Sequence, residues 1–290
     1  MEKQKGVREV SIQIKAGLKK ELMAFCRTRK FLVIALVMIG LAALSPILIT
    51  AMGSLMSSMG DIGVDVSEIT DVFGGSATSV GVSASVSDVR DLGLIVFLLL
   101  IYRAAGGEQK KRAVIIPKSA GLRSLGYIFP KYIVYPPAAL LLSIIAIFAS
   151  WGISAMIFSV NDLTFDTVLL VGILTGVSMM LYVSFHLALG TATGKAGLSA
   201  AVCIGASLIL PNVFALSGSD YMLNPFAIEI LAAQLAQLAV HPELSASAAR
   251  DIALTVGFAV LLMVLSFLIA LFAQNAKRID NTDDEISKAL

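Results

Sequence analysis

The sequence predicts an all-α membrane protein with six transmembrane helices, and three observations lead to this fold class. Apolar residues make up 57% of the 290 residues and charged residues only 14%, whereas soluble domains carry about 25% charged residues. The apolar residues form long continuous blocks. The basic residues fall in alternate gaps between those blocks. So few charges could not cover the surface of a soluble domain, so the chain is expected to lie in a lipid bilayer.

Six blocks meet the length requirement for crossing, because a helix needs about 20 largely apolar residues to span the hydrocarbon core. The second block is the weakest, since Asp91 and Arg103 bound it, and it must extend in one direction to cross. None of the block interiors contains a charged residue, which argues against a proton-driven antiporter with a buried carboxylate relay. The predicted spans are residues 31–52, 92–102, 132–158, 167–189, 198–216 and 252–272.

The basic residues predict the orientation of these spans. Of the 22 Lys and Arg residues, all but Arg90 and Arg250 fall in gaps that would share one side with both termini. The positive-inside rule assigns that side to the cytoplasm. We therefore expect a multi-pass cell-membrane protein, with a bacterial inner membrane as the best fit. Its parts would be a cytoplasmic segment 1–30, a six-helix domain 31–273 and a cytoplasmic tail 274–290.

Residues 10–30 predict an amphipathic helix that lies on the inner face of the membrane. Apolar residues recur there at intervals of four and three, and Lys or Arg fills the other faces. Such a helix binds the interface through its apolar side chains and anionic lipid through its basic ones. The alternative is that the segment acts only as a positive topology signal. The apolar stripe consists of Ile14, Leu18, Leu22 and Phe25.

The cytoplasmic loop 104–131 contains the most informative pattern between the spans. Gly106-Gly107 is expected to break the helix leaving the membrane, and residues 119–128 could form a short helix. Pro136-Pro137 would then stand in the first turn of the third span, where proline is tolerated. A solvated basic loop is one interpretation, but it has no need of Leu122, Leu125 and Phe129. These apolar side chains among charges favour docking onto another protein.

Two further segments are expected on the outer side. Residues 53–90 are rich in small and polar residues and predict an irregular loop with some helix. Within the segment 217–250, residues 221–240 predict a helix at the outer interface or a shallow re-entrant hairpin. Asn224-Pro225 would mark the start of that helix.

No catalytic or metal-binding constellation emerges from the sequence. His186 and His241 fall near opposite sides of the predicted bundle, so they cannot share a metal. The stretch 190–195 imitates a phosphate-binding loop but lacks its first glycine and the hydroxyl residue after the lysine. Cys26 and Cys203 are not expected to pair. Gly172 and Gly176 form a GxxxG pattern that allows close helix approach.

With these features, the chain resembles the membrane-spanning subunits of type-2 ABC exporters over most of its length. An amphipathic elbow precedes the first span, six spans follow, and a large outer loop comes after the first span. The first cytoplasmic loop is similar to that of the family, although Glu-Gln-Lys-Lys stands where the family often has Glu-Lys-Gly-Thr. Residues 223–226 are similar to the segment before the family's last span. The matching loop residues are Glu108, Val114, Ile115, Ile116, Pro117, Arg123 and Lys131.

The resemblance implies a permease subunit that is not itself an enzyme and binds no cofactor of its own. ATP and Mg²⁺ would belong to a separate ATP-binding cassette subunit, and a second permease subunit would complete a homodimer or heterodimer. No nucleic-acid partner is implied. Glu108 and Arg123 would make polar contacts with the ATPase, while Leu122, Leu125 and Phe129 would fill a groove in it. The full coupling set is Glu108, Pro117, Gly121, Leu122, Arg123, Leu125, Phe129 and Lys131.

Two other classes stay open. One is an ATP-independent channel or secondary carrier. The other, which the lack of acidic or histidine pairs within the spans disfavours, is a membrane-embedded enzyme.

Overall fold

The computed structural model describes residues 2–58, 77–110, 121–158, 161–216, 224–237 and 245–289, and in these ranges all regular structure is helical. Four of the described helices are long and apolar enough to cross a membrane: α2, α7, α8 and α11, over Lys30–Met52, Ser124–Ile157, Phe165–Thr193 and Arg250–Ala276. The predicted all-α fold is thereby confirmed for the described residues, and these four helices are compatible with a multi-pass membrane protein. The complete set of elements is α1 (Glu2–Arg27), α2 (Lys30–Ser58), α4 (Ala77–Asp88), a π-helix η1 (Val89–Gly93), α5 (Leu94–Lys110), α7 (Ser124–Ile157), α8 (Phe165–Thr193), α9 (Ala196–Leu216), α10 (Ile228–Gln237) and α11 (Ser245–Ala289).

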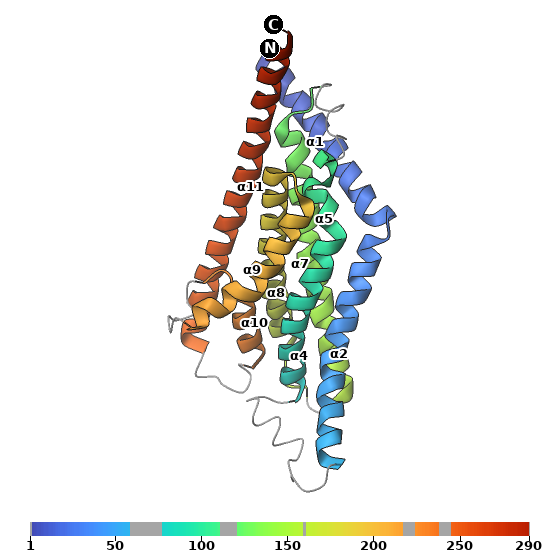
Figure 1. The fold of residues 1–290 in the computed structure, drawn as a ribbon. Coiled ribbons are helices and arrows are strands. Elements are labelled where there is room, and N and C mark those ends of the chain that lie inside the picture. The colour runs from blue at the N-terminus through green and yellow to red at the C-terminus, as the bar shows by residue number, and fades with distance from the viewer. Residues whose placement is uncertain are drawn as a thin grey trace.

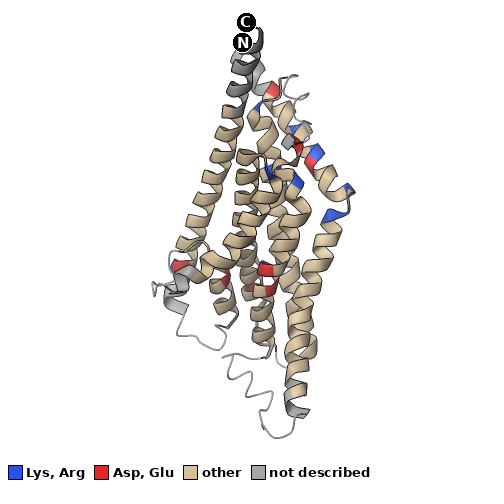
Figure 2. Cartoon of the chain, viewed as in Figure 1, with Lys and Arg blue, Asp and Glu red and all other residues tan. Residues whose placement is uncertain are grey.

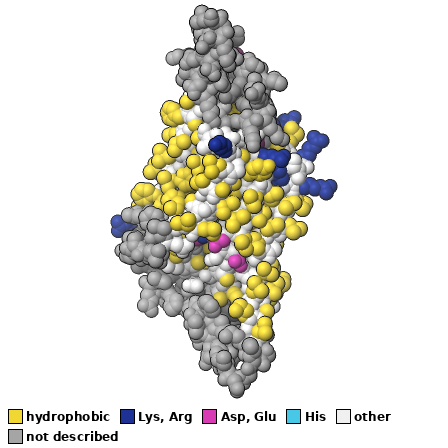
Figure 3. Space-filling view, in the orientation of Figure 1, with side chains coloured by type: hydrophobic (Ala, Val, Ile, Leu, Met, Phe, Trp, Pro, Cys, Tyr) yellow, Lys and Arg dark blue, Asp and Glu magenta, His cyan; other side chains and the backbone are white. Residues whose placement is uncertain are grey.

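Helix α8 is the centre of an elongated bundle. It contacts α5, α7, α9, α10 and α11, and most of its length is buried. The start of α1 and the end of α11 lie at the same end of the molecule, which we call the termini end (Figure 1). Apolar side chains cover the middle of the face seen in Figure 3. Such a belt matches the surface that lipid requires.

The GxxxG pattern produces the closest packing of α8. A side-chain carbon added at Gly176 would lie 2.9 Å from the Cα atom of Leu140 in α7, and one added at Gly172 would lie 3.2 Å from that of Ile144. Both positions therefore need glycine for the backbones of α7 and α8 to meet. The predicted close approach is confirmed.

The described part of the segment predicted as an irregular outer loop with some helix is helical throughout and mostly buried. Residues 77–110 run as α4, η1 and α5 without a break, so the weak second span extends through its charged N-terminal flank. Most side chains of α4 are buried, and the helix packs against α2, α7 and α10. The sequence did not predict the extent or the burial of this helix, because its serines and glycines give no apolar periodicity.

The segment formed by α4 and η1 is held in the bundle by two backbone carbonyls. Each of these carbonyls lacks its usual partner because a proline follows it by four residues. Proline has no N–H to donate to the carbonyl four residues earlier. Pro46 in α2 thus frees the carbonyl of Ala42, whose oxygen lies 3.0 Å from Ser85 Oγ of α4. Pro211 in α9 frees the carbonyl of Ser207, which accepts a 2.5 Å hydrogen bond from Arg90 Nη2.

Both helix boundaries predicted for the loop 104–131 are wrong. Helix α5 continues through Gly106-Gly107 to Lys110. A side-chain carbon at Gly106 would lie 2.6 Å from the carbonyl oxygen of Gly190, so this glycine serves packing against α8 and does not end the helix. Helix α7 begins at Ser124, which leaves Pro136-Pro137 in its interior and not in its first turn.

The helix predicted within residues 221–240 exists, but it begins at Ile228. Asn224 forms the turn before it, where its side-chain oxygen accepts a 3.0 Å hydrogen bond from the backbone N–H of Phe226. The helix buries Ala232 and Ala236 and packs against α8 and α4. Small residues on this face let α10 lie close to its neighbours.

Candidate functional site

Helix α1 docks along the first turns of α7 at the termini end. Arg29, with φ of 56°, breaks the chain between α1 and α2, which lets α1 take its own direction. A side-chain carbon at Gly17 would lie 2.6 Å from Pro130 Cγ, so the two helices meet closely there. In the predicted apolar stripe, Phe25 is buried, Ile14 and Leu18 are half-buried, and Leu22 is exposed.

A glutamine of α1 fixes the start of α7. Gln13 Nε2 donates to the carbonyl oxygen of Gly121 at 3.1 Å, and its Oε1 accepts from the backbone N–H of Arg123 at 3.1 Å. The first N–H groups of a helix have no partner within it. Gln13 therefore caps α7 from a different helix. Gly121 has φ of 88°, a conformation that favours glycine.

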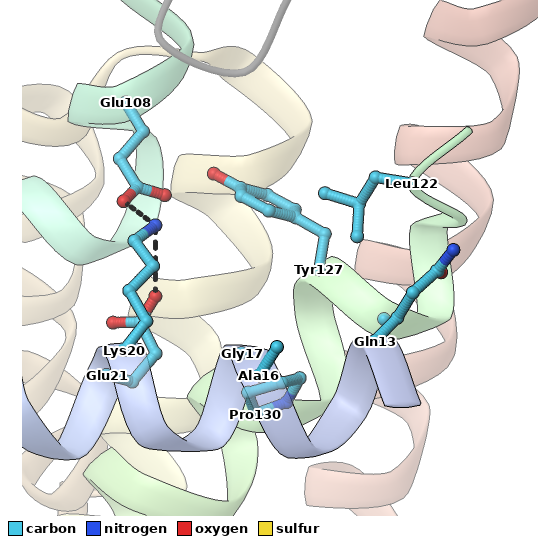
Figure 4. Close-up of a pocket in the computed structure, with 10 residues that line it drawn as sticks. Gln13, Ala16, Gly17, Lys20, Glu21, Glu108, Leu122, Tyr127 and Pro130 are labelled. Carbon is cyan, nitrogen blue, oxygen red and sulfur yellow. Dashed lines mark hydrogen bonds and ion pairs between the residues drawn. The ribbon is translucent and has the colours of Figure 1, made fainter. Parts of the chain in front are cut away.

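Four charged side chains form a connected network between α1, α5 and α7, which we call the charged joint: Lys20, Glu21, Glu108 and Lys131. Lys131 Nζ lies 3.0 Å from Glu21 Oε1 and 3.0 Å from Glu108 Oε2. Lys20 also pairs with Glu108, and its Nζ lies 3.7 Å from Glu21 Oε1. Figure 4 shows Lys20 reaching both carboxylates. The two positive and two negative charges balance within the joint.

Lys131 is the buried centre of the charged joint, since its side chain is only 2% exposed. The ring of Tyr127 lies 4.9 Å from its ammonium group, a distance at which cation and ring attract each other. Tyr135 donates a 2.8 Å hydrogen bond to the second oxygen of Glu21. A buried charge is tolerated when it is both paired and hydrogen-bonded, and these contacts meet that condition.

The charged joint shifts the pKa values of Glu108 and Lys20, its two more accessible members. Burial alone would raise the pKa of the Glu108 carboxyl, but the positive charge of Lys131 and the hydrogen bond and charge of Lys20 outweigh it and lower the pKa to about 2. Burial would lower the pKa of Lys20, but the hydrogen bond and charge of Glu108 raise it. Both groups are therefore charged throughout the physiological pH range.

A pocket of about 440 Å³ opens beside the joint, between α1 and the start of α7. Figure 4 shows the side chains of Gln13, Tyr127 and Leu122 around it. Its walls are mostly apolar, and its charged residues are already paired within the charged joint. Its lining residues are Gln13, Ala16, Gly17, Lys20, Glu21, Glu108, Leu122, Gly126, Tyr127 and Pro130.

The structure separates the predicted coupling residues into three groups. Glu108 and Lys131 meet each other in the charged joint. Gly121 and Arg123 are exposed, and Leu122 and Leu125 are half-buried. Phe129 packs edge-on against Phe267 of α11, with ring centroids 6.2 Å apart, so its ring has a partner within this chain. Pro117 lies outside the described residues, as do Val114, Ile115, Ile116, Leu223 and His241.

Sequence reasoning missed Gln13, Lys20, Glu21 and Tyr135 as members of this site. Glu21 could have been found, because it follows Leu18 by three residues and precedes Phe25 by four. That spacing places it on the apolar stripe of α1. An acidic residue there needs a buried cation. The pairing with Lys131, 110 residues away, has no signal in a single sequence.

A second charged cluster lies inside the bundle, where the sequence analysis expected no charge; its side chains are Arg90, Asp91, Ser178 and Glu229. Arg90 Nη2 lies 2.9 Å from Glu229 Oε1, and Nη1 pairs with Asp91. Ser178, in the middle of α8, donates a 3.2 Å hydrogen bond to Glu229 Oε2. Arg90 is 6% exposed and Glu229 5%. Acidic residues (red) gather at this level in Figure 2. The Arg90 cluster removes one reason for disfavouring an ion-coupled carrier.

The histidine and cysteine side chains in the described residues are not arranged as a reactive site. His186 is buried, and its Nδ1 lies 2.8 Å from Ser199 Oγ. The same oxygen lies 2.6 Å from the carbonyl oxygen of His186, to which it donates, so Ser199 is not set up as a nucleophile. Both cysteines are free. Within the described ranges, no group of three or more metal-binding side chains is placed to hold an ion.

Comparison of the chain with protein-family models found no match, and comparison with curated proteins found no relative. The site's chemistry therefore has to be inferred from its own geometry.

Proposed function

We propose that this chain is the membrane-spanning subunit of an ABC-type exporter and forms a transport pathway powered by ATP hydrolysis in a separate subunit. The observation that carries the proposal is the charged joint, which ties α1 and the end of α5 to the start of α7 at a single buried lysine. A force applied to α1 or to the exposed Gly121–Arg123 segment would reach α7 through the Gln13 hydrogen bonds. In this proposal α1 is the elbow helix, and α4–η1–α5 and α9 complete six crossings.

The charge distribution supports the corresponding orientation. Lys and Arg gather toward the termini end in Figure 2, where α1 and the start of α7 meet. The positive-inside rule would place this end in the cytoplasm, where a partner ATPase and ATP are available. A second permease subunit would bind through a face of the same bundle. A conformational change is favoured only by a partner that binds its two states with different affinity, and nucleotide binding to the ATPase would supply that difference.

The proposal can be tested on the tagged chain purified from its native membranes and reconstituted in lipid vesicles. We expect vanadate-sensitive ATP hydrolysis to co-purify with it, and ATP to drive cargo movement. Glu108→Lys should abolish cargo movement, because it places a third positive charge beside Lys20 and Lys131. Glu9→Lys makes the same change on the exposed surface of α1 and should leave transport intact. Absence of ATP hydrolysis from the native preparation would refute the proposal.

A secondary carrier is the second candidate, and the Arg90 cluster favours it. Ionisable residues within a membrane bundle often mark ion pathways. The two candidates differ in their energy source. Uptake into vesicles that an ionophore abolishes and added ATP does not drive would select the carrier.

A further inference from the structure

Arg90 connects three parts of the bundle that are far apart in sequence. It stands in η1, pairs with Glu229 of α10, and donates to the carbonyl of Ser207 in α9. Ser178 of α8 holds the other oxygen of Glu229 at 3.2 Å. Helix α10 thus has its first turn anchored at the mid-length of α8, while the rest of it runs toward the end opposite the termini (Figure 1).

The ion pair between Arg90 and Glu229 is a contact that can break and re-form. Removing two charges from water is costly, and a buried ion pair contributes less to stability than an apolar contact of the same volume. The other buried side chains of α10 are Ile228, Ala232 and Ala236, and the contacts of the two alanines separate without loss of interlocked side chains. In the first turn of α10, Ile228 supplies apolar packing and Glu229 supplies the directional contacts, to Arg90 and Ser178.

The guanidinium group also has unused bonding capacity. Within the described part of the chain, Arg90 Nε and the buried hydroxyl of Tyr182 have no hydrogen-bond partner. Arg90 stands in a π-helix, an element that occurs mostly as an insertion at functional positions in helices. Buried polar groups are normally satisfied. The Tyr182 hydroxyl interacts with Arg90, so it can accept a hydrogen bond from the guanidinium group when Glu229 is released.

We propose that Arg90 is a latch: its contacts with Glu229 and Ser207 hold α10 and α9 closed over α8, and release of Glu229 opens the outer half of the bundle. The proposal rests on the membrane orientation of the proposed function, but it requires no step of ATP hydrolysis. In the closed state that the structure shows, the side chains of α8 beneath α10 are sealed. Thr175, one turn from Ser178, is 0% exposed.

Thiol labelling from outside the cell measures the latch directly. Thr175→Cys serves as the reporter in a full-length chain that also carries Cys26→Ser and Cys203→Ala. We expect Glu229→Gln to raise the labelling rate by a membrane-impermeant maleimide about 10-fold, equivalent to about 1.4 kcal/mol of lost preference for the closed state. Ser178→Ala removes only a hydroxyl and keeps every charge. It should raise the rate about 3-fold, and it keeps the test valid if the glutamine variant does not fold.

Gln237→Ala is the matched control, because it removes the 3.3 Å hydrogen bond from α10 to Ser83 and leaves Arg90 untouched. Its labelling rate should equal that of the reporter alone. Wild-type rates in both the Glu229 and the Ser178 variants would overturn the latch. The latch would also be overturned if Gln237→Ala raised the labelling rate as much as Glu229→Gln does, or if the reagent labelled the Glu229→Gln variant equally fast from the cytoplasmic side. Either result would mean that the whole bundle is destabilised. Because the assay compares only thiol exposure among variants and measures neither ATP hydrolysis nor cargo movement, failure of the latch and failure of the exporter proposal give different results.

Discussion

Lys131 shows how one residue can hold three helices together. It is nearly inaccessible, and both of its carboxylate partners come from other helices, Glu21 from α1 and Glu108 from α5. The sequence places Lys131 and Glu108 in one predicted loop, and the family resemblance implies that Glu108 contacts a partner ATPase. The structure pairs them within the chain because the end of α5 and the start of α7 both reach the charged side chains of α1.

Lys131→Met should destabilise the protein by about 3–5 kcal/mol, the range observed when one partner of a buried ion pair is removed. Glu21 and Glu108 would then face each other without a buried cation between them. Thermal unfolding of the detergent-purified chain measures the loss. Lys19→Met on the exposed face of α1 should change stability by less than about 0.5 kcal/mol. Adding Glu21→Gln to Lys131→Met should recover part of the loss, and no recovery would contradict the pairing.

Acidification should weaken the joint through Glu108. Its pKa is lowered from the ordinary 4.5 to about 2 in the folded protein, so the folded state favours the ionised form. The resulting stability is present above pH 4.5 and is lost as the pH falls toward about 2. The difference in melting temperature between the wild type and Glu108→Gln should therefore be constant above that window and shrink within it. A difference that grows on acidification would contradict the assignment.

At the scale of the helices, the long apolar elements were predictable and the polar one was not. Blocks such as residues 31–52 and 167–189 give continuous apolar signals, and the structure has helices there. Helix α4 has serines and glycines in place of such a signal. Its Ser85 contacts a carbonyl that a proline exposes in α2, and Arg90 of the following η1 contacts the one that a proline exposes in α9. Those contacts are set by the tertiary structure, so no local pattern in one sequence reveals them.

The contact between α7 and α8 gives a test at this scale. Gly176→Ala should destabilise the protein by about 2 kcal/mol, within the range for overpacked interiors, because the new carbon would lie 2.9 Å from Leu140 Cα. Gly152→Ala in α7 meets nothing within 4 Å. That control should be neutral or stabilising by up to about 1 kcal/mol, since alanine favours helix. Similar melting temperatures for the two variants would show that the helices are further apart.

At the scale of the whole molecule, the sequence predicts the class of membrane proteins, whereas the structure is needed to see which helix faces are buried. Composition alone predicts a membrane protein, and four described helices meet the requirement for crossing. The two clusters of charged side chains lie at different levels of the bundle. The charged joint lies near the termini end, and the Arg90 cluster lies midway along the bundle. Only the joint includes residues of the predicted loop 104–131, Glu108 and Lys131, whose charge pattern stands out in the sequence.

The orientation can be measured with the cysteine that the chain already carries. Cys26 is exposed and Cys203 is buried, so an impermeant maleimide should label the native chain at Cys26 alone. We expect labelling in inverted membrane vesicles and none in intact spheroplasts, because the proposed orientation places α1 in the cytoplasm. Cys26→Ser should remove the signal. Labelling of intact spheroplasts would contradict the orientation.

The pairing of Ser85 with the carbonyl of Ala42 has a consequence for how the chain enters the bilayer during synthesis. Helix α4 is too polar to leave the translocon for lipid alone, since isolated polar groups are unfavourable there. Its hydroxyl and carboxylate groups find partners on α2, where Ser45 donates a 2.5 Å hydrogen bond to Asp88. We therefore expect α2 and α4 to leave the insertion machinery together, as one helical hairpin.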